Sequence, residues 1–217
     1  MKRVLTIACL LVCSLGLSAQ RYRVVDAEYF PKNEIYIQYG TPTVLELSNM
    51  LSGDIRQGQY VEGDYVGGSQ NHKFSGVVGV GYNFNVTRGL YLGAYFGLGY
   101  ADEELYLSGK GGEAFAKPVT LGKMSVISYV GEISAGYTYW SEGMMEISSA
   151  LYLGVAYLDE TMKLYTDDYY NPISYDKWKF SYHVTALKFR IGEAIGGFAE
   201  LGFGYRGLVN IGLSIKI

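Results

Sequence analysis

The chain ends in a segment, Gly197 to Ile217, in which nearly every second residue is apolar. The apolar positions are Ala199, Leu201, Phe203 and Tyr205, followed by Val209, Ile211, Leu213, Ile215 and Ile217. This alternation predicts β-strands, because successive side chains of a strand point to opposite faces. Each strand therefore presents one apolar face, and the fold depends on what that face contacts.

The same period of two recurs along the chain and predicts eight strands. Their expected ranges are 33–42, 73–84, 90–101, 123–139, 144–157, 178–191, 197–205 and 208–217. In the sixth range the apolar phase changes after Val184, so we expect a β-bulge near Thr185 and Ala186 that shifts the register by one residue.

The expected connections differ in length. Short, glycine-containing or polar turns with the sequences NVTRG, WSEG and GEAIG join strands two to three, four to five and six to seven. Long connections are expected over 43–72, 102–122 and 158–177, and a sharp turn over Tyr205–Gly207 joins the last two strands. Short turns at one end and long loops at the other are typical of an outer-membrane barrel.

A soluble β-sandwich would also alternate, but three features favour a barrel in lipid. The non-apolar face is rich in glycine, with 29 glycines in the chain, where a water-facing sheet would carry more Lys, Glu and Thr. Aromatic residues gather at the ends of the apolar stripes, as at a membrane interface. Each stripe has about the 9–11 residues that a tilted membrane strand needs. We therefore predict an all-β fold, an eight-stranded antiparallel up-and-down transmembrane β-barrel, closed by pairing of the last strand with the first.

The chain resembles the small eight-stranded outer-membrane barrels of Gram-negative bacteria, the OmpA/OmpX type, and a family described as "outer membrane protein beta-barrel domain". The similar segments are EIYIQYGTPT, YNFNVTRGLYLGAYF and GGFAELGFGYRGLVNIGLSIKI. The resemblance implies outer-membrane lipid and lipopolysaccharide as surroundings and the barrel-insertion machinery as a partner in biogenesis. The chain departs from the pattern at Ile217, where such barrels commonly end in Phe or Trp.

The first residues have the features of an export signal. Lys2 and Arg3 precede an apolar run and the small pair Ser18–Ala19, which predicts a secretory signal peptide over 1–19. A retained membrane helix needs about 20 apolar residues, and a lipid anchor at Cys9 or Cys13 lacks the expected context. Residues 20–32 are expected to form a periplasmic lead-in and 33–217 the barrel.

Charge and cysteine content narrow the function. Both cysteines lie in the predicted signal peptide, so the mature chain is expected to have no disulfide. A net charge of -3 and a pI near 5.5 give no reason to expect a nucleic-acid partner. No cofactor or metal is expected, because the acids lack the spacing of a Ca²⁺ loop.

The predicted interior carries a set of charges of both signs: Glu132, Glu146, Lys188, Arg190, Glu200 and Lys216. An eight-stranded barrel is just wide enough for its own side chains to fill. Because buried charges must be paired, we expect an internal ion-pair network that closes the lumen as a structural plug. A gated ion path through the same charges is the alternative.

The remaining candidates are histidines and loop residues. His72 is expected at the outer end of strand two and His183 inside the barrel, where it could belong to a lipid A-modifying enzyme only with an orienting acid and an oxyanion pocket. The third long connection groups acids and tyrosines that could grip a sugar or a divalent ion: Asp167, Asp168, Tyr169 and Tyr170. Thr43 and Glu46 form a capping-box pattern, which predicts a short amphipathic helix that covers the barrel mouth or lies at the membrane interface.

Three functions follow from these patterns. We expect a non-enzymatic outer-membrane protein, with a structural or surface-interaction role, whose barrel displays extracellular loops to a ligand that the sequence does not identify. A narrow ion channel with a charged lumen is the second hypothesis, and a lipid A-modifying enzyme is the third.

Overall fold

The computed structural model describes residues 31–46, 60–61, 64–110, 113–164 and 173–217 of the 217-residue chain. The signal peptide and most of the lead-in, predicted over 1–32, lie outside this part. The described residues form nine strands. Their bounds are β1 Asn33–Thr41, β2 Tyr60–Val61, β3 Asp64–Asn85, β4 Leu90–Lys110, β5 Glu113–Glu142, β6 Met145–Leu164, β7 Ile173–Gly192, β8 Ile195–Gly204 and β9 Val209–Lys216.

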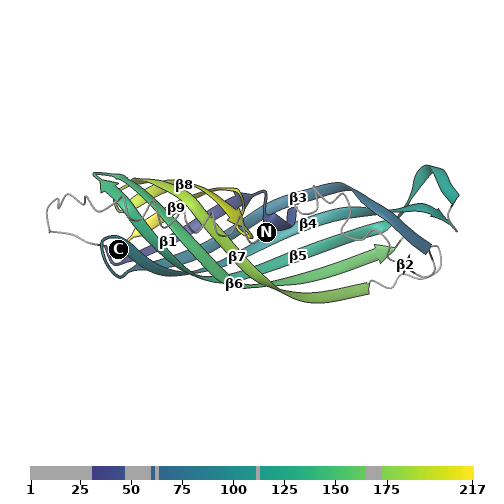
Figure 1. Ribbon diagram of the computed structural model, residues 1–217, viewed down its shortest axis with the longest axis horizontal. Helices are drawn as coiled ribbons and strands as arrows, with labels where there is room; N and C mark the ends of the chain where they lie inside the picture. Colours follow the sequence, from purple (N-terminus) through teal and green to yellow (C-terminus); the bar gives the residue numbers. More distant parts are fainter. Residues whose placement is uncertain (1–30, 47–59, 62–63, 111–112, 165–172) are drawn as a thin grey trace, which may run out of the picture.

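Eight of these strands close into one antiparallel up-and-down barrel (Figure 1). Each strand from β3 to β9 pairs with its neighbour in the sequence, and β2 is a two-residue addition at the edge of β3. Strand β1 closes the ring, because Ile37 lies opposite both Leu213 of β9 and Val80 of β3. The predicted fold class, including the pairing of the last strand with the first, is confirmed.

Burial alternates with a period of two, and the apolar side chains are the exposed ones. In β1, Glu34, Tyr36 and Gln38 are buried, whereas Ile35 and Ile37 are about half exposed. Strand β9 repeats the pattern, with Asn210 buried inside the barrel. The inside of the barrel is therefore its polar side.

Three short connections, over residues 86–89, 143–144 and 193–194, lie at one end of the barrel, here called the turn end. The chain's last strand also ends there, where Asn33 N donates to Ile217 O (3.0 Å) and Ile217 N donates to Asn33 O (2.8 Å). The opposite end, where β1 stops at Thr41 and β8 turns into β9, is called the far end. The predicted tight turns are confirmed.

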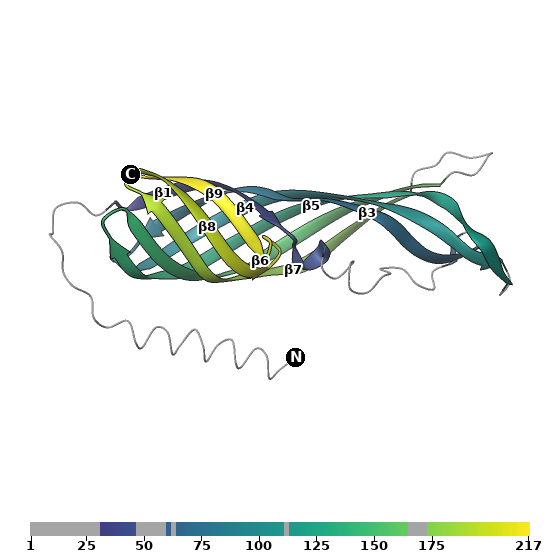
Figure 2. The ribbon, with the colours of Figure 1, turned by 90° about the horizontal axis from the view of Figure 1, so that it is seen from above.

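The expectation of long loops over 102–122 and 158–177 is wrong, because most of these residues are in strands. Strand β4 continues to Lys110 and β5 begins at Glu113, and β6 and β7 extend likewise to Leu164 and from Ile173. Beyond the ends of β1, β8 and β9, strands β3–β7 continue as a projecting sheet (Figure 2). Polar residues occur on both faces there, so the hydrophobic alternation that marks a strand fades although the pairing continues.

The bulge predicted in the sixth strand is confirmed in β7. The register with β8 shifts between Thr185 and Leu187, and both Ala186 and Leu187 are exposed. Ser149 Oγ of β6 donates a hydrogen bond to Ala186 O (2.7 Å). The extra residue returns the apolar side chains that follow to the outer face.

Within the described residues, no helix is long and apolar enough to cross a membrane.

Candidate functional site

The lumen gathers the charged residues of the barrel, and the structure places all six predicted charges in it. Glu132, Lys188, Arg190 and Glu200 are buried, and Glu146 and Lys216 are partly exposed at the turn end. Each sits at an inward position of its strand, because apolar neighbours occupy the outward positions. Five further charged or amide side chains that the sequence does not single out also lie in the lumen: Glu34, Gln38, Asn83, Arg206 and Asn210.

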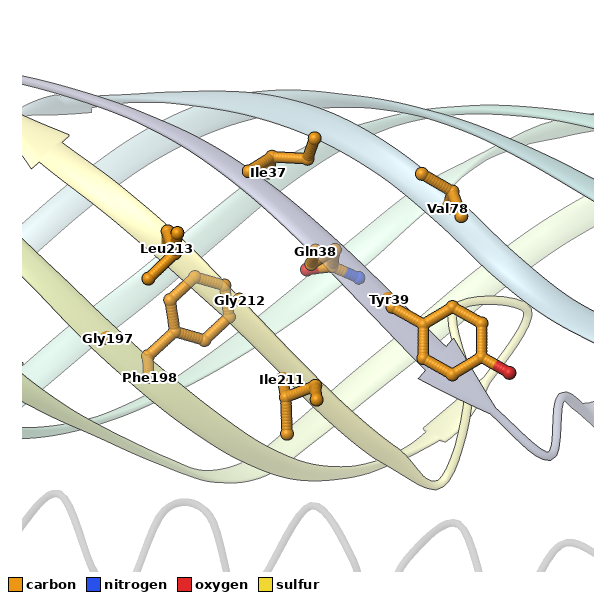
Figure 3. Close-up of a pocket in the computed structure, with 9 residues that line it drawn as sticks. All are labelled: Ile37, Gln38, Tyr39, Val78, Gly197, Phe198, Ile211, Gly212 and Leu213. Carbon is orange, nitrogen blue, oxygen red and sulfur yellow. The ribbon is translucent and has the colours of Figure 1, made fainter.

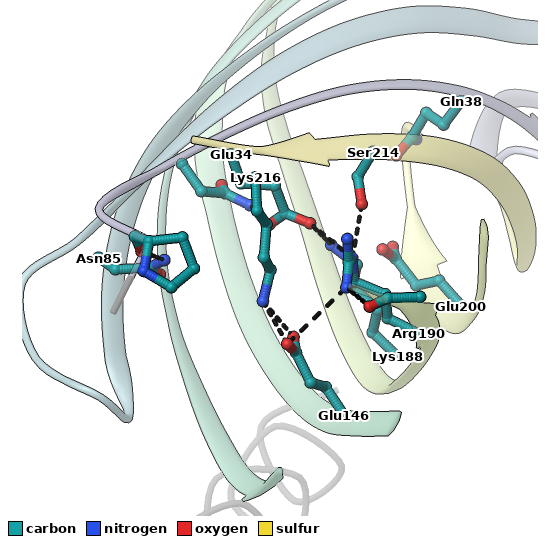
Figure 4. A network of polar contacts seen from close by, with 12 residues as sticks. Glu34, Gln38, Asn85, Glu146, Lys188, Arg190, Glu200, Ser214 and Lys216 are labelled. Carbon is teal, nitrogen blue, oxygen red and sulfur yellow. Dashed lines mark hydrogen bonds and ion pairs between the residues drawn. The ribbon is translucent and has the colours of Figure 1, made fainter. Parts of the chain in front are cut away.

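The first cluster lies toward the turn end and is built around Glu34 of β1 (Figure 4). Its Oε1 lies 3.7 Å from Lys188 Nζ and 3.6 Å from Arg190 Nε, and Asn83 Nδ2 donates to its Oε2 (2.9 Å). The Lys188 ammonium also lies 4.5 Å from the centre of the Phe198 ring. Lys188 and Arg190 thus share the Glu34 carboxylate, and the face of the Phe198 ring stabilises the Lys188 ammonium.

Arg190 connects this cluster to the turn end. Its Nε donates to Ser214 Oγ (2.7 Å) and its NH2 donates to Glu193 O (2.9 Å) in the β7–β8 turn. Its NH1 lies 3.8 Å from Glu146 Oε1, and Lys216 Nζ donates to the same carboxylate. Glu146 therefore balances part of the charge of two bases across the opening of the barrel.

The second cluster lies deeper, around Glu200 of β8. Its Oε1 is 2.9 Å from His183 Nε2 and accepts hydrogen bonds from Thr185 Oγ1 (2.8 Å) and Asn210 Nδ2 (3.3 Å). Its Oε2 pairs with Arg206 NH2 at 3.4 Å. A single carboxylate therefore contacts polar groups from β7, β9 and the β8–β9 turn.

Arg206 is the feature that sequence reasoning missed most clearly. The sequence places it in a sharp turn between the last two strands, but its side chain enters the barrel and is fully buried. Its guanidinium lies 3.8 Å from the Tyr152 ring centre and 4.5 Å from that of Tyr95, and it donates to Gln38 Oε1. The period-two pattern stops at the turn, so it does not predict the direction of this side chain. The one hint in the sequence is the set of aromatic residues at inward positions, because their ring faces attract a cation.

Glu132 differs from the ion-pair prediction. Ser181 Oγ donates to its Oε1, and among the described residues it has no ion-pair partner within 4.0 Å. Its other oxygen has no hydrogen-bond partner there. Among the described residues, the buried Ser134 Oγ and His183 Nδ1 also have no hydrogen-bond partner.

The far end of the lumen is covered by two short segments. Thr43–Glu46 forms the predicted capping box, because Glu46 N donates to Thr43 Oγ1 (3.2 Å) and Thr43 N donates to Glu46 Oε2. Glu46 Oε1 accepts from Gly76 N (3.1 Å) on β3. The β8–β9 turn is held beside it, since Leu208 N donates to Pro42 O (2.8 Å).

Of the remaining candidates, His183 is the one that the described part of the structure places in this site. It lies in the lumen as expected, fully buried, with Glu200 as its acidic partner. His72 lies within β3, with its side chain outside the described part, and Asp167, Asp168, Tyr169 and Tyr170 fall outside it altogether. No group of three metal-ligating side chains occurs among the described residues.

The outer face carries an apolar belt bounded by two rows of aromatic side chains. The far row comprises Tyr39, Tyr100, Tyr129, Tyr157 and Trp178, and the row at the turn end comprises Tyr82, Phe84 and Tyr137. In the far row, Tyr129, Tyr157 and Trp178 are direct neighbours on three strands, with ring centres 6.0 and 5.0 Å apart.

Comparison with known proteins found no matching family model, curated protein or solved structure. The function is therefore inferred from the geometry of this chain alone.

Proposed function

We propose that the protein is an outer-membrane β-barrel with a structural or surface-interaction role and no catalytic one. The observation that carries this proposal is the inversion of polarity across the barrel wall. Leu213 and Ile211 are 61% and 57% exposed on the outside, whereas Arg206 and Glu200 are at most 1% exposed inside. Such a continuous apolar exterior would be unfavourable in water and is favourable against lipid chains.

Residues 1–19 would direct export, and the barrel-insertion machinery would place the barrel in the outer membrane. Amphipathic aromatic rings belong at headgroup level, so the two aromatic rows would mark the two interfaces. The turn end would face the periplasm. The projecting sheet of β3–β7 would then stand outside the cell, beyond outer-membrane lipid and lipopolysaccharide.

The surface that supports an interaction role is the free edge of β7. Pairing with β8 ends at His183 and Gly204, so among the described residues β7 has no neighbour on that side from Ile173 to Phe180. Tyr205 N donates to Tyr182 O (3.1 Å), which shows that even-numbered residues in this part of β7 turn their backbone groups toward that edge. Unpaired edge groups can accept a strand from another polypeptide.

Two large apolar side chains strengthen this edge as a contact surface. Trp178 and Phe180 are 71% and 65% exposed and follow the exposed Asp176 and Lys177. An extended partner would gain backbone hydrogen bonds from the edge and side-chain contacts from these rings.

The membrane part of the proposal is tested by expressing the full chain in a Gram-negative host. We expect the protein in the outer-membrane fraction, with an unboiled gel band that runs faster than the boiled one. Recovery in the soluble periplasm would contradict the proposal.

The interaction part is tested by photo-crosslinking on intact cells, with the crosslinker at position 177. Asp176→Pro removes one backbone donor that faces the free edge, so we expect it to abolish crosslinks to a partner, whereas Asp176→Asn should keep them. If Asp176→Pro and Asp176→Asn crosslink equally, the free edge of β7 is not the contact surface.

The channel and enzyme hypotheses have their own tests. Charges of both signs line the lumen, so a narrow ion path is the second hypothesis. Single-channel steps in a planar bilayer that are lost on changing Arg190 or Glu132 would favour conduction over the structural role. A changed lipid A mass spectrum in cells with the protein would favour the enzyme.

A further inference from the structure

The outer face of the barrel is not uniform, because an apolar groove crosses β8, β9, β1 and β3 (Figure 3). Its volume is about 440 Å³. Its walls are the outward side chains of Ile37, Tyr39, Val78, Ile211 and Leu213, and no charged residue lines it. The groove lies within the apolar belt, at the strands that close the barrel.

The groove exists because Gly197 has no side chain on the outer face. Gly197 occupies an outward position where other strands carry a large apolar side chain, and a Cβ atom on it would contact only Gly212 O, at 4.0 Å. Gly212 lies on the inward side, where the Phe198 ring would be 2.4 Å from an added Cβ. Bare backbone at Gly197 and Gly212 therefore forms the floor, with the Phe198 ring beneath it on the lumen side, and Leu213 and Ile211 form the raised walls.

One end of the groove carries its single outward polar group, the Tyr39 hydroxyl. Figure 3 shows the ring of Tyr39 at the end away from Leu213, with its hydroxyl directed further away. Within the described residues this hydroxyl has no hydrogen-bond partner. Tyr39 belongs to the far aromatic row, so the groove runs from the middle of the belt to the level of that row.

We propose that this groove binds one acyl chain of a bilayer lipid, with the polar part of the lipid accepting a hydrogen bond from Tyr39. The inference rests on the proposed membrane function. The groove is only as wide as the single glycine position that forms it and lies between branched side chains. A narrow, flexible acyl chain therefore fits it. The broad wall of a second copy would be held off by Ile211 and Leu213, which are more than half exposed.

The test uses the full chain inserted into phosphatidylcholine vesicles, extracted in mild detergent and weighed by native mass spectrometry. We expect the wild type to retain one lipid. Gly197→Leu fills the groove, and we expect it to lower the retained lipid about tenfold, equivalent to about 1.4 kcal/mol. Tyr39→Phe should lower it less, because only the hydrogen bond is lost.

Gly131→Leu is the matched control. Gly131 is an outward glycine of β5 with nothing within 4 Å of an added Cβ, so this variant should retain the lipid like the wild type. Equal retention by the wild type and Gly197→Leu would overturn the proposal, and so would a wild-type dimer that Gly197→Leu dissociates.

The same samples are run unboiled and boiled on a gel. If the wild type neither inserts into vesicles nor shows a faster unboiled band, both the membrane function and the lipid-binding groove are contradicted. If the proteins insert but Gly197→Leu and Gly131→Leu retain equal amounts of lipid, only the groove proposal is contradicted.

Discussion

Glu200 is the residue on which the deeper charges of the barrel most depend. It accepts hydrogen bonds from Thr185 and Asn210, contacts His183, and is the only carboxylate within 4.0 Å of the Arg206 guanidinium among the described residues. Removing one partner of a buried pair leaves the other charge uncompensated, which is more unfavourable than removing both.

We therefore expect Glu200→Ala to lower the free energy of unfolding by about 3–5 kcal/mol. The measurement is urea unfolding of the refolded chain in lipid vesicles. Glu193→Ala, at an exposed turn position, should have little effect. The double variant Glu200→Leu with Arg206→Met should be more stable than Glu200→Ala, and a double variant that is still less stable would contradict the pairing argument.

Asp102, in the projecting sheet, makes the stability of that sheet depend on pH. Partial burial opposes its charge, but hydrogen bonds from Lys123, Tyr100 and Ser125 outweigh it and hold the pKa of the carboxyl below its ordinary value of 3.8. Lys123 Nζ lies 2.7 Å from Oδ2 and Ser125 Oγ lies 2.8 Å from Oδ1. A carboxyl with a lowered pKa stabilises the folded chain above its ordinary pKa, and this contribution is lost as pH falls through the folded value.

We expect Asp102→Asn to lower the urea midpoint at pH 7, with a difference from the wild type that shrinks as pH falls from about 5 to about 3. A difference that stays constant over this range would show that the charge of Asp102 is not responsible.

At the scale of single residues, the sequence is informative where the alternation is unbroken. The inward positions of Lys188, Arg190 and Glu200 follow from their apolar neighbours. Arg206 cannot be found in the same way, because it lies in a turn where side-chain direction is set by tertiary packing. Glu34 does not stand out although its strand alternates, since only its contact with Lys188 and Arg190 shows its role.

At the scale of strands, close packing between inward side chains and bare backbone fixes the width of the lumen. Tyr95 of β4 lies across Gly79 of β3, where an added Cβ would be 2.2 Å from the phenol oxygen. Any side chain at position 79 must therefore displace the ring of Tyr95, which packs 4.5 Å from the Arg206 guanidinium.

Gly79→Val should therefore destabilise the barrel by about 1–3 kcal/mol through overpacking. Gly131→Val, at an outward position with open space, should leave the free energy of unfolding within about 0.5 kcal/mol of the wild type. The measurement is the same urea titration in vesicles, and equal midpoints for the two variants would show that the lumen can accommodate the extra side chain.

Strands can be predicted inside the apolar belt and not beyond it. All eight barrel strands are evident in the sequence because the belt imposes a polar and an apolar face on each. The continuations of β4 to Lys110 and of β6 to Leu164 are not evident, because strand pairing there does not separate apolar from polar residues. The bulge of β7 is predictable, since one extra residue is the usual way for a paired strand to change phase.

At the scale of the whole molecule, the chain combines a closed barrel and an open sheet. The barrel buries charge and exposes apolar side chains, and the projecting sheet carries the free edge of β7, of which residues 173–177 lie beyond Trp178 of the far aromatic row. Closure of the barrel leaves no open sheet edge where lipid would surround the strands. The projecting sheet keeps an open edge on β7, where water or a partner can form hydrogen bonds with its backbone groups.

The most direct test of this account is the environment of single spin labels on the chain in lipid vesicles. The only cysteines, Cys9 and Cys13, lie in the predicted signal peptide, so single cysteines can be introduced into the mature chain at Leu92, Leu151 and Asp176. We expect labels at 92 and 151 to collide mainly with oxygen, which concentrates in the bilayer, and the label at 176 to collide mainly with a water-soluble nickel complex. Labels at 92 and 151 that prefer the nickel complex would contradict the central claim that this outer face meets lipid.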